Sequence, residues 1–194
     1  MKDTAEDKNM ADNSNKDTDM GKIKVGADTI YKEAWRLLEK RTPLCVDCGQ
    51  LCGGACCDDG GRDDAGMYLF CGEDVMYKNM PEWLRVEKSE FEYSGGKYAP
   101  IAMCSGRCER KMRPLSCRIF PLAPYKKENE PLRVIIDPRA KAMCPLARAL
   151  GQNELEAEFV HAVKLVFGVL IRNKDVRDFI IEQSYLLDEA VRFF

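Results

Sequence analysis

The chain has 194 residues, of which 45% are hydrophobic and 32% are charged, and its formal net charge is −2. A chain of this length can bury a core without crosslinks, and so small a charge exerts no overall attraction on nucleic acid or on an anionic membrane. No stretch approaches the roughly eighteen consecutive apolar residues of a membrane-spanning helix. We therefore expect neither a membrane nor a nucleic acid as partner.

Residues 1–24 are polar and carry six acidic residues and three lysines before Gly21. They lack the apolar core of a secretory signal peptide and cannot bury enough surface to offset their ordering entropy. We predict a disordered acidic tail and a cytoplasmic protein. In that reducing compartment, clustered cysteines are metal ligands or catalytic thiols more often than disulfides.

The remaining chain predicts an α+β fold. Residues 28–41 favour an N-terminal helix, with Ile30, Ala34, Leu37 and Leu38 on one face, that stops before Thr42-Pro43. Short strands are predicted at 67–70, 119–125 and 132–136. A β-hairpin is predicted around Ser94-Gly95-Gly96.

The C-terminal third contains two apolar stripes at helical spacing, from Leu155 to Leu170 and from Val176 to Val191. They predict an antiparallel helix pair that packs on the cysteine-bearing half. We accordingly divide the chain into the tail, a metal-stapled cysteine-rich domain at 25–151, and the helix pair at 152–194.

Eight of the ten cysteines are crowded into two runs, CVDCGQLCGGACC at 45–57 and CSGRCERKMRPLSCRIFP at 104–121. Zinc and iron–sulfur clusters both require several thiolates held close together, and CxxC spacing supplies two from one turn of backbone. Glycines in the first run allow the backbone to turn tightly around a small object. With the cysteine at 144, the predicted metal ligands are Cys45, Cys48, Cys52, Cys56, Cys57, Cys104, Cys108, Cys117 and Cys144.

The residues leave open whether there are one or two metal centres. Side chains of neighbouring residues tend to point apart, so Cys56 and Cys57 could serve two centres, or one of them could have a packing role. Five cations near Cys108 and Cys117 are expected to offset thiolate charge, because a four-thiolate zinc site carries about two negative charges. They are Arg107, Arg110, Lys111, Arg113 and Arg118.

The spacing CxxC…CC, followed by RPLSCRIFP at 113–121, resembles the YkgJ family, also called the CxxCxxCC family of zinc- or iron-chelating proteins. The resemblance spans about residues 45–145. It implies that the metal ligands include Cys45 or Cys48, together with Cys56, Cys57, Cys104, Cys108, Cys117 and Cys144. The first run holds one cysteine more than the family pattern, either Cys45 or Cys52. We interpret Cys71 as a buried free cysteine outside the ligand set.

We therefore predict a metal-binding protein that holds zinc or iron, with a 4Fe-4S cluster as one form. Whether it is also an enzyme stays open, with a non-enzymatic role favoured. An unidentified protein partner is expected besides the metal ion. One alternative is an iron–sulfur enzyme related to flagellin lysine-N-methylases, which the YkgJ family is similar to over its cysteine region. The other is a thiol redox protein that uses Cys45 and Cys48, although the motif lacks a thioredoxin-like βαβ setting. The only histidine, His161, is predicted to lie on the surface.

Overall fold

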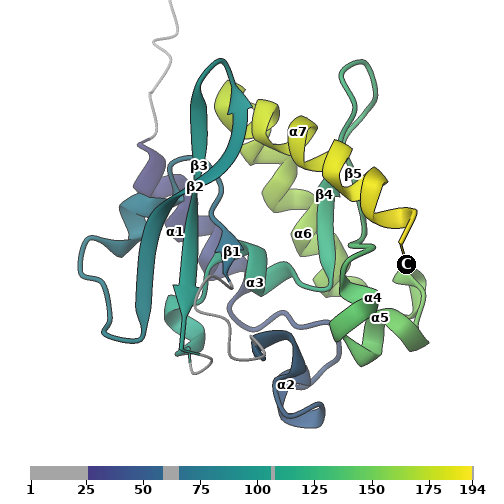
Figure 1. Cartoon of the computed structure of the whole chain (residues 1–194). Coiled ribbons are helices and arrows are strands. Elements are labelled where there is room, and N and C mark those ends of the chain that lie inside the picture. Colours follow the sequence, from purple (N-terminus) through teal and green to yellow (C-terminus); the bar gives the residue numbers. More distant parts are fainter. Residues whose placement is uncertain (1–25, 59–65, 106–107, 194) are drawn as a thin grey trace, which may run out of the picture.

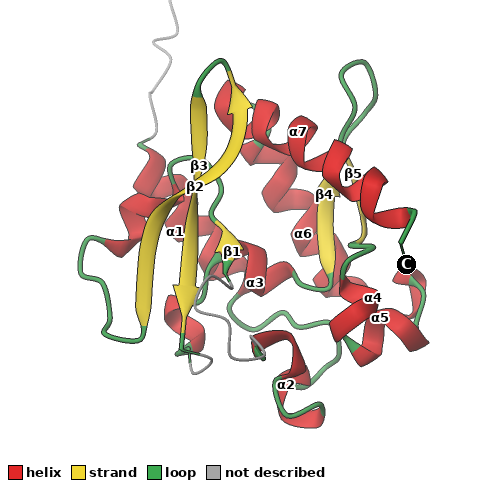
Figure 2. Ribbon diagram, in the orientation of Figure 1, coloured by secondary structure: helices red, strands yellow, loops and turns green. Residues whose placement is uncertain are grey.

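Helices and two small antiparallel sheets make up the fold, which is of the α+β class as predicted (Figure 1, Figure 2). The computed structural model describes residues 26–58, 66–105 and 108–193, so the predicted tail at 1–24 lies outside the described residues. None of the described helices combines the length and the apolar composition that a membrane crossing needs.

The N-terminal helix α1 spans Ala27–Leu38 and buries Tyr31, Ala34, Trp35 and Leu38. These positions lie on one helical face, rotated slightly from the predicted one, since Ile30 and Leu37 are only partly buried. The helix ends before the predicted residue 41. The guanidinium group of Arg110 donates to the carbonyls of Leu38, Glu39 and Arg41 at 2.6–3.1 Å, which satisfies the acceptors that a helix end leaves unpaired.

The larger sheet has the strand order β1-β3-β2, with β1 at Met67–Tyr68, β2 at Leu84–Ser94 and β3 at Lys97–Cys104. The predicted hairpin is confirmed and is longer than expected. Its turn has positive φ values at Gly95 (53°) and Gly96 (88°), the backbone geometry for which glycine is favoured in two-residue hairpin loops. Strand β3 ends at Cys104, which pairs with Leu84 at the start of β2.

The second sheet pairs β4 (Leu122–Tyr125) with β5 (Arg133–Ile136). The strand predicted from residue 119 begins only at 122, because Leu115–Ile119 form the helix α3. Two distant acceptors favour this helix. The amide of Leu115 donates to the Glu73 carboxylate at 2.6 Å, and the Ser116 hydroxyl donates to the carbonyl of Tyr68 at 2.7 Å.

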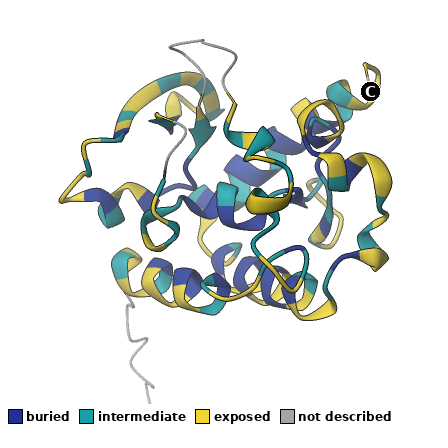
Figure 3. Cartoon of the chain, turned by 90° about the horizontal axis from the view of Figure 1, so that it is seen from below, coloured by how far each residue is buried: buried dark blue, intermediate teal, exposed yellow. Residues whose placement is uncertain are grey.

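The two C-terminal helices are α6 (Ala157–Leu170) and α7 (Lys174–Val191), joined by a short turn whose Asn173 caps α7. Both contribute to the main core. The ring of Phe70 lies between them, with centroids 4.8 Å from Phe167 and 5.4 Å from Phe179. Buried residues gather where these helices meet α1 and the larger sheet (Figure 3).

The cysteine-bearing part is built from short elements: α2 (Cys48–Leu51) and the 3-10 turns η1 (Ala55–Cys57), η2 (Glu73–Tyr77) and η3 (Arg110–Met112). Beside them lie α4 (Ala140–Met143), α5 (Pro145–Ala149) and the 3-10 turn η4 (Gln152–Glu154). No residue of α2, η1 or η3 is buried. Burial of apolar side chains therefore contributes little to holding α2, η1 and η3 in place.

Candidate metal centre

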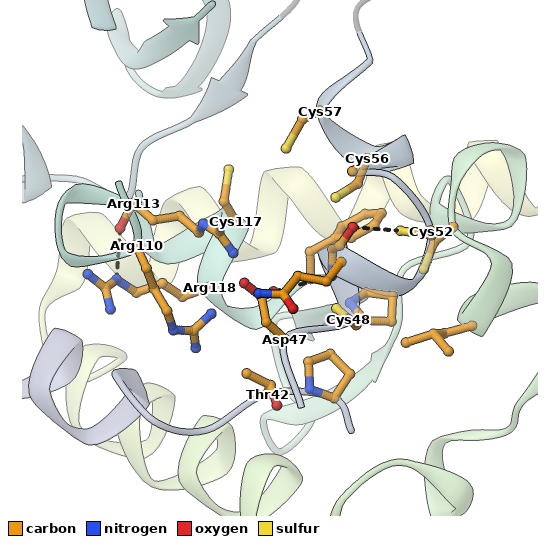
Figure 4. Close-up of a pocket in the computed structure, with 18 of the residues that line it drawn as sticks. Thr42, Asp47, Cys48, Cys52, Cys56, Cys57, Arg110, Arg113, Cys117 and Arg118 are labelled. Atoms are coloured by element: carbon orange, nitrogen blue, oxygen red, sulfur yellow. Dashed lines mark hydrogen bonds between the residues drawn. The ribbon is translucent and has the colours of Figure 1, made fainter. Parts of the chain in front are cut away.

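Three segments that are far apart in the sequence surround one cavity of about 310 Å³ (Figure 4). The first is α2 with η1, the second contains η3 and α3, and the third is the junction of α4 and α5. The structure brings together seven of the nine predicted ligands around this cavity, which we call the thiol pocket: Cys48, Cys52, Cys56, Cys57, Cys108, Cys117 and Cys144.

The first segment reaches the thiol pocket through a tight turn. The carboxylate of Asp47 accepts the amide of Gly49 and caps α2. After α2 the chain passes through Gly53 (φ 65°) and Gly54 (φ 74°), a conformation that costs other residues about 1 kcal/mol or more. This turn brings Cys56 and Cys57, on η1, to the same pocket as Cys48.

The second segment is anchored by two buried charged side chains. Glu73 is fully buried and accepts from the amides of Leu115 and Phe70 and from the indole of Trp35. Burial raises the pKa of the Glu73 carboxyl to about 7, against the opposing effect of these donors. The side chain of Arg118 is also fully buried and holds the loop before α3 through backbone carbonyls. Together these two side chains fix α3, and with it Cys117.

The predicted compensation of thiolate charge by five cations is only partly seen. Arg113 donates from Nε to Cys108 Sγ at 3.3 Å. Arg110 and Arg118 instead donate to carbonyl groups, and Arg118 also pairs with Glu39 at 2.6 Å. Lys111 pairs with Glu109 on the surface. Arg107 lies outside the described residues. Arg110 and Arg118 thus organise the backbone around the site, because a guanidinium group can serve several carbonyls at once.

Three thiols of the pocket, Cys48, Cys56 and Cys117, have a raised pKa, which favours their protonated form. Burial raises the pKa of Cys117 and of Cys48, and neighbouring thiols add to the effect. Within the adjacent pair, the hydrogen bond from Cys56 lowers the pKa of Cys57 and raises that of Cys56, and Arg113 lowers the pKa of Cys57 further. Its surroundings thus favour the thiolate form of Cys57, and a bound cation would favour ionisation of Cys48, Cys56 and Cys117 as well.

Three cysteines lie outside the thiol pocket. Cys45 is exposed, and its Sγ donates to the carboxylate of Glu156 at 2.9 Å, so the pKa of this thiol is raised. Cys104 is half-buried at the end of β3 and interacts electrostatically with Cys117. Cys71 is buried and donates to the carbonyl of Asp175, which confirms the predicted buried free cysteine.

All ten cysteines are described, and none of them forms a disulfide. Across the described residues, no three side chains of His, Cys, Asp or Glu are already close enough together to hold a metal ion. His161 is exposed on α6, as predicted. The lining of the thiol pocket nonetheless supplies sulfur atoms and the carboxylate of Asp47, types of donor that suit zinc, copper(I) or iron–sulfur chemistry and not the hard cations.

Sequence reasoning missed two of the groups that shape the site. Asp47 could have been found from its place between two cysteines and directly before a short helix, where aspartate acts as a cap. Glu73 has no local signal, because its partners Trp35 and Leu115 are 38 and 42 residues away. Comparison with known proteins adds no further assignment, as no family model, curated protein or solved structure matches the chain.

Proposed function

We propose that this chain is a metal-binding protein whose cysteine thiolates hold zinc or an iron–sulfur centre in the thiol pocket. One observation carries the proposal: seven thiols from three distant segments line a single cavity. Apolar packing accounts for few of these thiols, because six of the seven are exposed or only partly buried and only Cys144 is buried in an apolar cluster, with Ala140 and Ala147. A soft metal would convert the ring of thiols into a crosslink between the segments.

The arrangement of the RPLSCRIFP segment supports membership of the YkgJ family. Arg113 of this segment contacts Cys108, Cys117 lines the thiol pocket, and Arg118 is buried beside Trp35 with its guanidinium group 4.7 Å from the ring. These polar side chains of the RPLSCRIFP segment therefore either line the pocket or hold the backbone that supports it. A family pattern built for metal binding would require such an arrangement.

A structural role for the metal follows from the packing. Since α2, η1 and η3 bury no residues, these three segments lack an apolar core of their own. Structural zinc contributes on the order of 10 kcal/mol to folding, and four protein thiolates leave no open position for a substrate. The metal would then staple this part of the fold, which favours a non-enzymatic role and a reducing location such as the cytoplasm.

The thiol redox alternative is less well supported. A nucleophilic cysteine needs a lowered pKa, whereas the hydrogen bond with Glu156 raises the pKa of Cys45 and burial raises that of Cys48. Cys45 also lies outside the pocket that Cys48 lines. The two members of the CxxC pair therefore have different partners.

The direct test is to purify the full chain anaerobically, record its visible spectrum, and measure metal and acid-labile sulfide. A brown protein with sulfide identifies a cluster, and a colourless protein with zinc identifies a structural ion. Cys117→Ser should reduce the metal content, whereas Cys71→Ser, a matched buried control, should leave it unchanged. Unaltered metal content in Cys117→Ser would contradict the proposal.

A further inference from the structure

A second cavity, of about 630 Å³, lies beside β5 and shares no lining residue with the thiol pocket. Its lining consists of residues 132–135, most of which belong to β5, of Gln152 and Asn153 on η4, and of Lys164 on α6. We call it the β5 groove. Its volume falls in the range of roughly 300–1,000 Å³ that is usual for binding sites.

The edge of β5 that faces away from β4 carries main-chain groups without partners. The amide of Asp137 donates to the carbonyl of Pro121 at 2.9 Å, so these two residues form a hydrogen-bonded pair in the register of the sheet. Because such pairs alternate along an antiparallel ladder, Val134 and Ile136 direct their N–H and C=O groups away from β4. No described strand lies on that side (Figure 2), and no described residue forms a hydrogen bond with these groups. Val134 is only 6% exposed, so the groove that it lines must supply its partner.

The outer edges of β4 and β2 are protected from pairing, in contrast to that of β5. On β4, the nitrogen of Pro124 faces away from β5 and has no hydrogen to donate. Just after β4, the amide of Lys126 donates to the hydroxyl of Ser184 at 2.9 Å. On β2, shifts of register interrupt the ladder between Lys88 and Ser94. Prolines and bulges are features that keep a sheet edge from pairing with another chain, and β5 has neither.

The charges along the β5 groove are positive. Lys164 and Arg133 line it, and none of the described lining residues is acidic. Lys164 forms no ion pair with a described residue, and Arg133 has only an exposed pair with Glu130, a kind of contact that contributes about 1 kcal/mol at most. Val134 packs in the main core together with α6, whereas the guanidinium group of Arg133 lies over the ring of Tyr125 on the other face of β5. The open edge therefore has a cation on each of its two sides.

We propose that the β5 groove binds an extended acidic segment of a protein partner, which adds to the open edge of β5 as a third strand. The unpaired groups of Val134 include a donor and an acceptor, and an extended peptide satisfies both, whereas a small anion only accepts hydrogen bonds. Side chains alternate along the added strand, so its carboxylates can reach Lys164 on one side and Arg133 on the other. A second copy of this chain fits less well, because it would bring the same cations into one groove. The proposal does not depend on metal binding.

The test follows the backbone amide signals of the full chain by NMR while a short peptide of alternating glutamate and valine is added. Signals of residues 132–136, 152–153 and 164 should shift, and a peptide of alternating lysine and valine should leave them in place. Methylation of the amide nitrogens of the acidic peptide should abolish the shifts, because it removes the main-chain donors. Lys164→Glu should weaken binding about threefold or more. The matched control Lys141→Glu changes an exposed lysine outside the groove and should bind as wild type does.

Four results would overturn the proposal. Unshifted signals at residues 132–136 with the acidic peptide would show that the edge of β5 does not accept a strand. Equal shifts with the methylated peptide or with free glutamate would indicate a site for small anions. Formation of a dimer that shifts the same signals would identify a second copy as the occupant. The full chain with its six acidic residues before Gly21 changed to amides supplies the last comparison: shifts of these signals without any peptide would identify the N-terminal segment of this chain as the occupant.

Discussion

Glu73 gives the sharpest prediction about stability, because a fully buried carboxyl must respond to pH. Its pKa is raised by burial from 4.5 to about 7. A group that binds its proton more tightly in the folded chain stabilises the fold fully below its unfolded pKa, and this stabilisation is lost as the pH rises through the folded pKa. At about 1.4 kcal/mol per pH unit, the free energy of unfolding should fall by about 3 kcal/mol between pH 4.5 and pH 7 because of this group.

The perturbation is Glu73→Gln, which keeps the shape of the side chain and cannot ionise. The amide replaces one acceptor oxygen of a carboxylate that binds Trp35, Phe70 and Leu115, so a roughly constant cost of about 1–3 kcal/mol is expected. On top of this cost, the variant should gain about 3 kcal/mol relative to wild type as the pH rises from 4.5 to above 7.

The assay is urea unfolding of both proteins across this pH range, with stability differences taken at each pH. Other titrating groups, including the thiols, are common to the two proteins and cancel in the difference. A difference that stays constant from pH 4.5 to pH 8 would refute the conclusion that Glu73 is buried as a titrating group in the folded chain.

Three further substitutions test the fold around the site by urea unfolding. Arg118→Met should lower the free energy of unfolding by about 3–5 kcal/mol, because it leaves buried carbonyl groups and a carboxylate without their donor. A decrease below about 1 kcal/mol would indicate that this arginine lies at the surface. Phe70→Ala should destabilise by about 3–5 kcal/mol, while the exposed control Phe193→Ala should destabilise by less than about 0.5 kcal/mol. Equal effects would contradict the packing of the Phe70 ring between α6 and α7. Gly54→Ala should destabilise by about 1 kcal/mol, because Gly54 has a positive φ. Gly168→Ala should stabilise by about 0.5–1 kcal/mol, because Gly168 lies within α6 and has open space for a methyl group. The same sign for both changes would contradict the backbone conformations of these two glycines.

Local sequence patterns predicted the elements whose conformation depends mainly on residues close to them in the sequence. The apolar spacing of α6 and α7 follows from helix geometry, and the turn at Gly95-Gly96 follows from the freedom of glycine to adopt positive φ. The helix α3 was not predicted, because residues 115–119 take their helical form from acceptors on Glu73 and on Tyr68, more than 40 residues away.

The candidate site shows the same division between local and distant causes. The spacing of the cysteines indicated that two runs would meet, and seven thiols do line one pocket. Which cysteine of the first run lies outside the pocket could not be predicted, since Cys45 is held there by Glu156, 111 residues further along the chain. The binding of basic residues to backbone carbonyls likewise depends on where α1 ends, which composition does not reveal.

The most direct test of the account is the metal content of the anaerobically purified full chain, set beside the number of thiols that react with a thiol reagent under native conditions. We predict bound zinc or iron together with protection of the pocket thiols, and a rise in reactive thiols when a chelator removes the metal. A folded protein that carries no metal, takes up none on titration with zinc or on cluster reconstitution, and shows the same thiol reactivity with and without chelator would contradict it.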